Sequence, residues 1–382
     1  MPHDNRDRNV AISISQGAAL PAGHPHLQTM LRRLPGLARP LLSPWRRHYT
    51  AATTPAADAR PLRILFCGSD AFSIASLRAL VHVQHGVPRL IDSIHVLHRP
   101  AKPTGRGLKT LRPVPIEQVA AHELSLATSA VDTFTGWSPP APVDLVIAVS
   151  FGLLVPPRIL GHAHYGGLNV HPSLLPDLRG PAPIEHAVVK RRKHTGVSVQ
   201  TLHPRHFDQG IVLAQTPPPG IPIAPGTTSR QLEEQLAHVG AQMLVDVVKS
   251  RTFVPPLQDA GWYAHSNYPT DHAPKITKRD RFVDLETDTL QDILAKQRAF
   301  GDPWCILPSG DRLILHTVID ADIADSSGHR AGFFVGPNGK EPWFRPACGR
   351  IGILAKSTYE GNKQGHGNAK LVRILAQGQA PG

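Results

Sequence analysis

The chain has 382 residues, of which 41% are hydrophobic and 18% charged, a composition typical of a folded protein of about two domains and not of a disordered one. It has no run of about eighteen apolar residues, which excludes a membrane-spanning helix, and its three scattered cysteines exclude a disulfide framework or a thiolate zinc site. The 41 basic against 29 acidic residues give a net charge of +12, which favours a polyanionic partner, a targeting segment, or both.

The N-terminal residues 1–57 account for much of this charge. They hold seven arginines against two aspartates, a net +5, and no acidic residue stands between Asp7 and Asp58. The arginines alternate with apolar residues as in a weakly amphipathic helix, and Arg47-His48-Tyr49 resembles the processing site of matrix proteins. Such arginine-rich, acid-poor termini are typical of organellar transit peptides. We predict a transit peptide over 1–57 and a location in the mitochondrial matrix; a disordered basic tail is the alternative.

The following part, 62–255, has the pattern of an α/β domain. Six short apolar runs are predicted strands of one sheet, the last two forming a hairpin: 62–66, 91–97, 143–149, 168–171, 196–201 and 210–214. An apolar-periodic helix follows the first strand, and a longer one begins at Thr228, where Gln231 completes a capping box, and runs to Lys249. Strands separated by helical stretches indicate a parallel sheet covered on both faces.

The C-terminal third is predicted to be a second, smaller domain. The polar, proline-punctuated stretch 256–275 is interpreted as the linker, and residues 276–382 as a small β-barrel. Its predicted strands are short and separated by Gly, Pro and Asn turns: 312–316, 332–335, 351–354 and 371–375. The stretch 340–382 holds seven basic residues against two acidic ones, as a nucleic-acid-binding surface would.

The turn after the first strand, Gly68-Ser69-Asp70, stands where nucleotide-binding folds cradle phosphate. It holds one glycine instead of Gly-x-Gly-x-x-Gly, and no Lys-Ser/Thr pair follows it. Dinucleotide and ATP binding therefore lose their main support. A tight turn between strand and helix and a turn that lines a ligand site both remain open.

Three polar residues form the strongest candidate site. Asn169 and His171 are two apart in a predicted strand, so their side chains share a face at its carboxyl end, where open α/β sheets bind ligands. An uncharged amide donor beside a titratable imidazole is suited to polarising a carbonyl oxygen. Asp208 lies in the predicted hairpin turn, where a carboxylate could orient the imidazole, raise its basicity or take a proton. Each residue taken singly also has an ordinary structural explanation.

A basic loop follows the second strand. Between residues 99 and 112 it holds five cations and no acid: Arg99, Lys102, Arg106, Lys109 and Arg112. Glycines and prolines should keep the loop extended, and clustered cations on an extended loop suit the phosphates of a nucleic acid. For a basic run taken alone, a solvated surface loop is the better interpretation.

These motifs together resemble the folate-dependent formyltransferases, and among them the mitochondrial enzymes that act on methionyl-tRNA. The resemblance extends over about residues 62–375 and rests on four segments: Asn169-Val-His171-Pro-Ser-Leu-Leu-Pro176, Arg179-Gly180-x-Ala-Pro-Ile184, Thr195-Gly-Val197 and Asp208-x-Gly210. It implies a Rossmann-like parallel-sheet formyltransferase domain over 62–255 and an OB-like, tRNA-binding β-barrel over 276–382.

The resemblance also implies roles for residues. Asn169, His171 and Asp208 match the catalytic three, and the residues matching folate contacts are Phe72, Phe151, Gly152, Leu153, Ser173, Leu174, Leu175 and Pro176. The basic loop matches the segment that reaches the acceptor stem, with Arg106 at the family's arginine. The implied substrates are 10-formyltetrahydrofolate and initiator methionyl-tRNA, with no metal, no membrane insertion and a monomeric enzyme. Asn169 and protonated His171 would hold the oxyanion, and Asp208 would help remove the proton of the amine.

The chain departs from the family pattern in two motifs, and its linker over 256–274 is longer and richer in histidine and proline. Gln209 replaces the usual threonine between Asp208 and Gly210, and Ser69-Asp70 replaces Thr-Pro after Gly68. Two other functions remain open: another 10-formyltetrahydrofolate-using enzyme, either a small-amine formyltransferase or a formyl-folate hydrolase, and a non-catalytic RNA-binding protein on a decayed enzyme scaffold. Retention of all three catalytic residues argues against decay, and the basic loop and second domain argue against a small-amine substrate.

Overall fold

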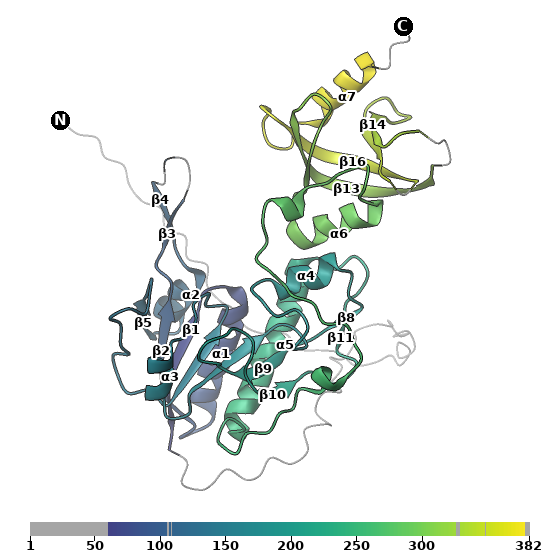
Figure 1. Ribbon diagram of the computed structural model, residues 1–382. Helices are drawn as coiled ribbons and strands as arrows, with labels where there is room; N and C mark the ends of the chain where they lie inside the picture. Colours follow the sequence, from purple (N-terminus) through teal and green to yellow (C-terminus); the bar gives the residue numbers. More distant parts are fainter. Residues whose placement is uncertain (1–59, 105–106, 108, 326–328, 348, 379–382) are drawn as a thin grey trace, which may run out of the picture. The chain divides into compact units, whose positions relative to one another are not determined.

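The computed structural model describes residues 60–382 apart from 105–106, 108, 326–328, 348 and 379–382 (Figure 1). The predicted transit peptide over 1–57 and the predicted tRNA contact Arg106 therefore lie outside the described residues. In the part of the chain that the structure describes, no helix is long and apolar enough to cross a membrane.

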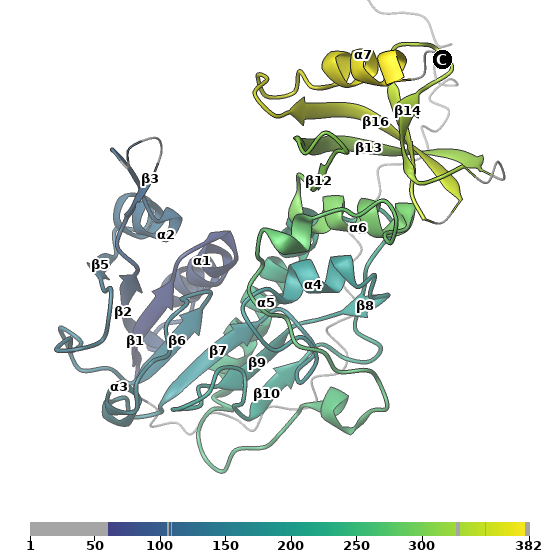
Figure 2. The same ribbon diagram turned by 45° about the horizontal axis from the view of Figure 1, so that its top comes forward.

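The first domain is built on a seven-stranded sheet, whose strands Figure 2 shows in spatial order. That order is β5 (Ala127–Ala130), β2 (Ile91–His98), β1 (Leu62–Gly68), β6 (Leu145–Val149), β7 (Gly167–His171), β9 (Ser198–Thr201) and β10 (Val212–Gln215). The five strands from β5 to β7 are parallel, whereas β9 is antiparallel to β7 and to β10. All six predicted strands are present. Strand β5 was not predicted, because its sequence, Ala-Thr-Ser-Ala, contains no run of large apolar residues.

Helices and loops cover both faces of this sheet. On one face α1 (Ala71–Gly86) and α5 (Ser229–Ser250) pack against the strands, and α4 (Pro183–Val189) joins the same core. On the other face the strands pack against α3 (Pro157–His162) and residues 131–155. The predicted capping box at the start of α5 is formed, with the Thr228 hydroxyl accepting from the Gln231 N–H at 3.3 Å. Burying these apolar residues contributes about 25 cal/mol per Å² removed from water.

Smaller elements complete the first domain. The basic loop contains a short hairpin, β3 (Lys102–Thr104) and β4 (Thr110–Arg112), where an extended loop was expected. It leads into α2 (Pro115–Gln118) and a π-helical turn (Val119–Glu123), and β8 (His194–Thr195) pairs with β11 (Ile221–Pro222).

The second domain is a five-stranded antiparallel sheet between two helices (Figures 1 and 2). The strands lie in the order β12 (Trp304–Ile306), β13 (Arg312–Ala324), β16 (Arg350–Tyr359), β15 (Pro342–Arg345) and β14 (Gly332–Val335). Helix α6 (Leu290–Phe300) packs beside β13, and α7 (Asn368–Gly378) packs on β16 and β14. The expected class, an α/β domain followed by a small β domain, is confirmed.

The strand predicted at 371–375 is wrong, because these residues belong to α7. Branched side chains favoured a strand, but Leu371 and Leu375 are four residues apart and both pack on the core of the sheet, which is a helical spacing. Ahead of them, the Asn368 side chain donates to the Leu354 carbonyl at 2.7 Å. Tertiary packing thus overrides a weak local preference.

The segment predicted as a linker is bonded to the first domain along much of its length. Ala273 is fully buried, and its N–H donates to the Arg179 carbonyl at 2.7 Å. Upstream, burial raises the pKa of Tyr263 to about 12, so its hydroxyl keeps the proton that it donates to the Pro269 carbonyl. Polar composition favoured a linker, but the backbone of this segment also pairs with the first domain, where the Ala260 N–H donates to the Val212 carbonyl at 2.7 Å.

A buried carboxylate ties β1 to the segment before β6. Asp144 has a side chain only 1% exposed, and it accepts from the backbone N–H of Arg63 at 3.0 Å and from both Arg63 and Arg60 guanidinium groups. Hydrogen bonding to Arg63 lowers the pKa of Asp144. Such a carboxylate stabilises the fold above its unfolded-state pKa of about 3.9 and loses that contribution as the pH falls through its lower folded-state pKa.

We therefore expect Asp144→Asn to lower the free energy of unfolding at pH 7 by roughly 1.5–3 kcal/mol, the range for hydrogen bonds to charged groups. The difference from the wild type should shrink as the pH is lowered below about 4. Urea unfolding over a pH series measures both. The control is Glu234→Gln, which removes one partner of an exposed pair with Arg230 and should change stability by less than about 0.5 kcal/mol. A larger loss in the control than in Asp144→Asn would contradict this account.

Candidate active site

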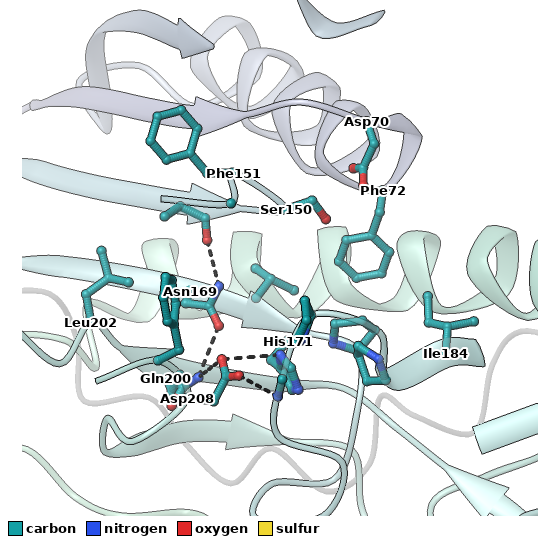
Figure 3. A pocket seen from close by; sticks show the side chains of 18 of the residues that line it. Asp70, Phe72, Ser150, Phe151, Asn169, His171, Ile184, Gln200, Leu202 and Asp208 are labelled. Atoms are coloured by element: carbon teal, nitrogen blue, oxygen red, sulfur yellow. Dashed lines mark hydrogen bonds and ion pairs between the residues drawn. The ribbon is translucent and has the colours of Figure 1, made fainter. Parts of the chain in front are cut away.

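A cavity of about 590 Å³ opens at the carboxyl ends of β1, β6 and β7. This is the place where open α/β sheets bind ligands. Figure 3 shows Phe151, Ser150, Asp70 and Phe72 along one side of the cavity. Along the other side it shows the predicted catalytic residues, Asn169, His171 and Asp208, together with Gln200. The tertiary structure thus brings together the three residues that sequence singled out.

Asn169 is held by both ends of its amide. Its Nδ2 donates to the Ala148 carbonyl at 2.9 Å, and its Oδ1 accepts from Gln200 Nε2 at 3.0 Å. The antiparallel pairing of β7 and β9 sets Gln200 directly opposite Asn169. An amide nitrogen carries two N–H groups, so one remains to donate into the cavity.

Asp208 is held by three neighbours in a strained turn. Its Oδ2 accepts from the backbone N–H of Gly180 at 2.9 Å, and its Oδ1 lies 3.4 Å from both His171 Nδ1 and Gln200 Nε2. Asp208 itself has φ +55°, in the left-handed region that few residues other than glycine adopt. Backbone strain of this kind clusters at functional sites, where surrounding contacts hold it in place.

His171 is buried, and both of its ring nitrogens meet protein atoms. Nε2 lies 3.1 Å from the Leu178 carbonyl, which can only accept, so Nε2 carries a proton. Nδ1 lies 3.4 Å from Asp208 Oδ1. The ring is thus held between a carbonyl oxygen and a carboxylate oxygen, at the edge of the cavity.

The predicted folate contacts divide into two groups. Phe72, Phe151, Gly152 and Leu153 line the cavity, as expected. In contrast, the Ser173–Pro176 segment, comprising Ser173, Leu174, Leu175 and Pro176, is absent from the cavity lining. The Ser173 hydroxyl donates to the Asp177 carbonyl at 2.6 Å, and the side chains of the two leucines are buried. These four residues therefore do not form a wall of this cavity.

One part of the cavity lining is acidic. Asp70 accepts a hydrogen bond from the Ser73 N–H and so caps α1, and it also lines the cavity. The turn after β1 therefore both connects strand to helix and forms part of the cavity wall. Burial raises the pKa of Asp70, and burial followed by the charges of Asp70 and Glu185 raises the pKa of Glu233. Gly68 serves packing, because a Cβ there would lie 2.7 Å from Ile116 Cδ1.

The basic hairpin presents three of its five predicted cations to solvent. Lys102, Lys109 and Arg112 are exposed, while Arg106 lies outside the described residues. Arg99 differs from them, since its guanidinium pairs with the Asp132 carboxylate at 2.6 Å and its side chain is 22% exposed. Arg99 is therefore less available to a phosphate than the other three.

Sequence reasoning missed Gln200 and Gly180, which hold the side chains of Asn169 and Asp208. Gln200 lies in a predicted strand, and an amide side chain at a strand position was the only sign of a special role. Its partners follow from the register of β9 against β7, which the sequence does not show. Gly180 supplies a backbone N–H, which no side-chain pattern marks.

Comparison with known proteins shows the family of the chain. The Formyl transferase family pattern matches residues 62–248. The mitochondrial methionyl-tRNA formyltransferase of Saccharomyces cerevisiae is 33% identical over 278 residues, which cover 63% of this chain and 68% of that protein. The chain belongs to the methionyl-tRNA formyltransferase family. A bacterial member, from Aromatoleum aromaticum, is 33% identical over 64% of this chain and 73% of its own length.

The human mitochondrial relative is 32% identical, and the match spans 69% of this chain and 63% of that protein, less than two thirds of its length. Among solved structures, an N-formyltransferase from Helicobacter canadensis in complex with folinic acid and dTDP-3-aminofucose has a TM-score of 0.50 and 11% identity, covering 77% of this chain and 98% of that one. A 4-N formyltransferase from Francisella tularensis also scores 0.50, at 13% identity, over 67% of this chain and 97% of that one. These two likenesses show the fold.

Within the described ranges, no group of three or more His, Cys, Asp or Glu side chains could hold a metal ion.

We expect Gly210→Ala to destabilise this family member. A Cβ at Gly210 would lie 1.7 Å from the Thr201 carbonyl oxygen, so the turn that carries Asp208 would have to move. Its N–H also donates to Gln200 Oε1 at 3.0 Å, so the shift would disturb the amide that joins Asn169 to Asp208. Overpacking of this kind costs about 1–3 kcal/mol of unfolding free energy, measurable by urea titration.

The control is Gly161→Ala in α3, where an added Cβ meets no atom within 4 Å. There stability should stay constant or rise by up to about 1 kcal/mol, because alanine favours helix. Equal losses in the two variants would show that the close approach at Gly210 is not the cause.

Proposed function

We propose that the chain transfers a formyl group from 10-formyltetrahydrofolate to the α-amine of initiator methionyl-tRNA. The observation that carries this proposal is the joined group of Asn169, His171 and Asp208, tied together by Gln200 and open to the cavity. An amide donor, a cationic ring and a carboxylate are what an acyl transfer between two nitrogens needs: an oxyanion stabiliser and a proton acceptor.

In the proposed reaction the methionyl amine attacks the formyl carbon, and the carbonyl oxygen becomes an oxyanion. The free N–H of Asn169 donates to that oxygen, and the positive charge of His171 stabilises it through the low-dielectric cavity. Asp208 accepts the proton that leaves the attacking nitrogen. The oxyanion then re-forms the carbonyl, the bond from carbon to folate N10 breaks, and N10 takes up the proton held by Asp208 as it leaves.

The cavity suits a folate in size and lining. At about 590 Å³ it falls within the range of about 300–1,000 Å³ common for small-molecule sites. The rings of Phe72 and Phe151 offer apolar walls to a flat heterocycle. For the Ser173–Pro176 segment we propose a supporting role: the Ser198 hydroxyl donates to the Ser173 carbonyl at 2.8 Å, which fastens this segment to β9.

For the rest of the chain we keep the expectations from sequence as proposals. The boundaries are a transit peptide over 1–57, a catalytic domain over 62–255, a linker over 256–275 and a tRNA-binding domain over 276–382. Because the matched relatives from yeast and human are named as mitochondrial, we propose that this chain acts in the mitochondrial matrix in translation initiation, as a monomer.

Replacing a proposed catalytic side chain should slow transfer strongly while leaving the fold intact. We expect Asn169→Ala and Asp208→Ala each to lower kcat by about 10²–10³, the usual cost of removing an oxyanion donor or a catalytic acid or base. The assay is formylation of methionyl-tRNA with 10-formyltetrahydrofolate supplied and omitted, and circular dichroism checks folding. Gln209→Thr, which restores the family's residue at an exposed position, is the control and should stay within about twofold of wild type. Full activity in either alanine variant would refute the assignment.

Removing the positive charge of the hairpin should weaken RNA binding without changing the rate of formyl transfer. We expect joint replacement of these cations by glutamine to raise the KM for methionyl-tRNA; the cations are Lys102, Arg106, Lys109 and Arg112. In a plot of log KM against log salt concentration, the slope should fall by about one for each phosphate contact that is lost. The kcat and the KM for the folate should not change. Arg78→Gln, which removes a surface cation paired with Glu123, is the matched control. An unchanged salt slope in the fourfold variant would exclude an RNA role for the hairpin.

The alternative of a small-amine formyltransferase or a formyl-folate hydrolase is tested with the same enzyme. Release of tetrahydrofolate is measured with charged tRNA, with free amines and with neither. Turnover that needs charged tRNA supports the proposed function, whereas equal turnover without it supports the alternative.

A further inference from the structure

An exposed aromatic side chain stands at the rim of the cavity beside the proposed catalytic carboxylate. Phe207 directly precedes Asp208, lines the cavity and is nevertheless 58% exposed. Burying a phenylalanine side chain is worth about 1.5–3 kcal/mol, so a ring left in water at the mouth of a site has most of that free energy available for a ligand.

The same turn holds two more flat rings. His203 and His206 also line the cavity, and their rings are stacked with centroids 5.1 Å apart and planes 27° from parallel. His203 Nδ1 accepts from the backbone N–H groups of Arg205 at 3.2 Å and His206 at 3.1 Å. These bonds order the turn before any ligand arrives, so little conformational entropy is lost on binding.

Three rings and an exposed arginine in one ordered turn are the features that proteins use to bind unpaired bases. Bases of single-stranded nucleic acid stack on aromatic side chains, including histidine, while nearby cations neutralise the phosphates. Arg205 is exposed within this turn and supplies such a cation. We name residues 203–207 the rim turn.

The proposed reaction determines which base can reach the rim turn. The methionyl group is esterified to the ribose of the terminal nucleotide, and its amine must come within reach of Asp208. The base on that ribose is only a few bonds farther away, and Phe207 is the neighbour of Asp208 in the chain. A base so placed lies outside the cavity, at its mouth, which is where the exposed ring is.

We propose that the rim turn is the binding site for the unpaired 3′-terminal base of the acylated tRNA, with Phe207 as the principal stacking surface and His203 and His206 beside it. This inference rests on the proposed function, whose substrate supplies the base. It assigns a role to a segment that the sequence motifs leave out, since only Asp208 and Gly210 at its end belong to the family pattern.

The test is a double-mutant cycle on the full-length enzyme. Phe207→Ala and wild type are each assayed with two substrates: chemically acylated methionyl-tRNA with its normal 3′ end, and the same tRNA ending in a ribose without a base. Removing the ring or the base should each lower kcat/KM about tenfold, within the range for one stacked base. Removing both should also cost about tenfold, because either change alone abolishes the contact.

Three controls make the outcome specific. Phe207→Trp should restore kcat/KM, because it keeps a stacking surface. Ile211→Ala removes an exposed apolar side chain four residues farther along the chain, which does not line the cavity, and should change nothing. The KM for 10-formyltetrahydrofolate should stay the same in Phe207→Ala. Since Phe207 is exposed, its replacement removes little from the core, and the base-free tRNA probes the wild-type enzyme without any mutation.

Two results would overturn the inference while leaving the proposed function intact. A loss of about a hundredfold when ring and base are both removed would mean that the two act independently. A raised KM for the folate, with the KM for tRNA unchanged, would mean that the ring serves the formyl donor. Failure of wild-type enzyme to formylate normal methionyl-tRNA would instead refute the proposed function itself.

Discussion

The candidate active site depends on one contact: the backbone N–H of Gly180 donating to the carboxylate of Asp208 at 2.9 Å. Asp208 sits in a left-handed turn after β9, and Gly180 in the loop after β7, so this bond joins the two segments that carry Asn169, His171 and Asp208. Gln200 then connects Asp208 to Asn169 by a second route. Without the antiparallel placement of β9 beside β7, neither connection could form.

Residues 271–273 pack against the loop that contains Gly180 and hold it in place. The Leu178 N–H donates to the Asp271 carbonyl at 2.7 Å, and a Cβ at Gly180 would lie 2.4 Å from the Ala273 carbonyl oxygen. Arg192 bridges the carboxylates of Asp177 and Asp271, at 3.0 and 2.8 Å. The stretch leading to the second domain therefore supports the loop that holds Asp208, and its polar residues are used in these contacts.

The structure shows that part of the positive charge counted in the sequence is neutralised by neighbouring acidic side chains. Several basic residues counted toward a nucleic-acid surface have acidic partners: Arg99 with Asp132, Arg345 with Asp325, and Arg350 with Asp320. Exposed lysines such as Lys102 and Lys109 are better placed for phosphates. Net charge reports a sum over the chain, whereas a polyanion responds to the cations that remain unneutralised at its own surface.

Local pattern was enough to predict six strands of the first sheet and the long helix capped at Thr228, because periodicity is a property of short segments. It also singled out Asn169, His171 and Asp208, which the structure brings to one cavity. It failed for residues 371–375, where packing of Leu371 and Leu375 decided in favour of a helix. Only the tertiary structure decided that Gln200 and the Gly180 N–H hold Asn169 and Asp208, and that the Ser173–Pro176 segment does not line the cavity. Strand register and backbone donors join residues distant in the chain, and no local pattern records them.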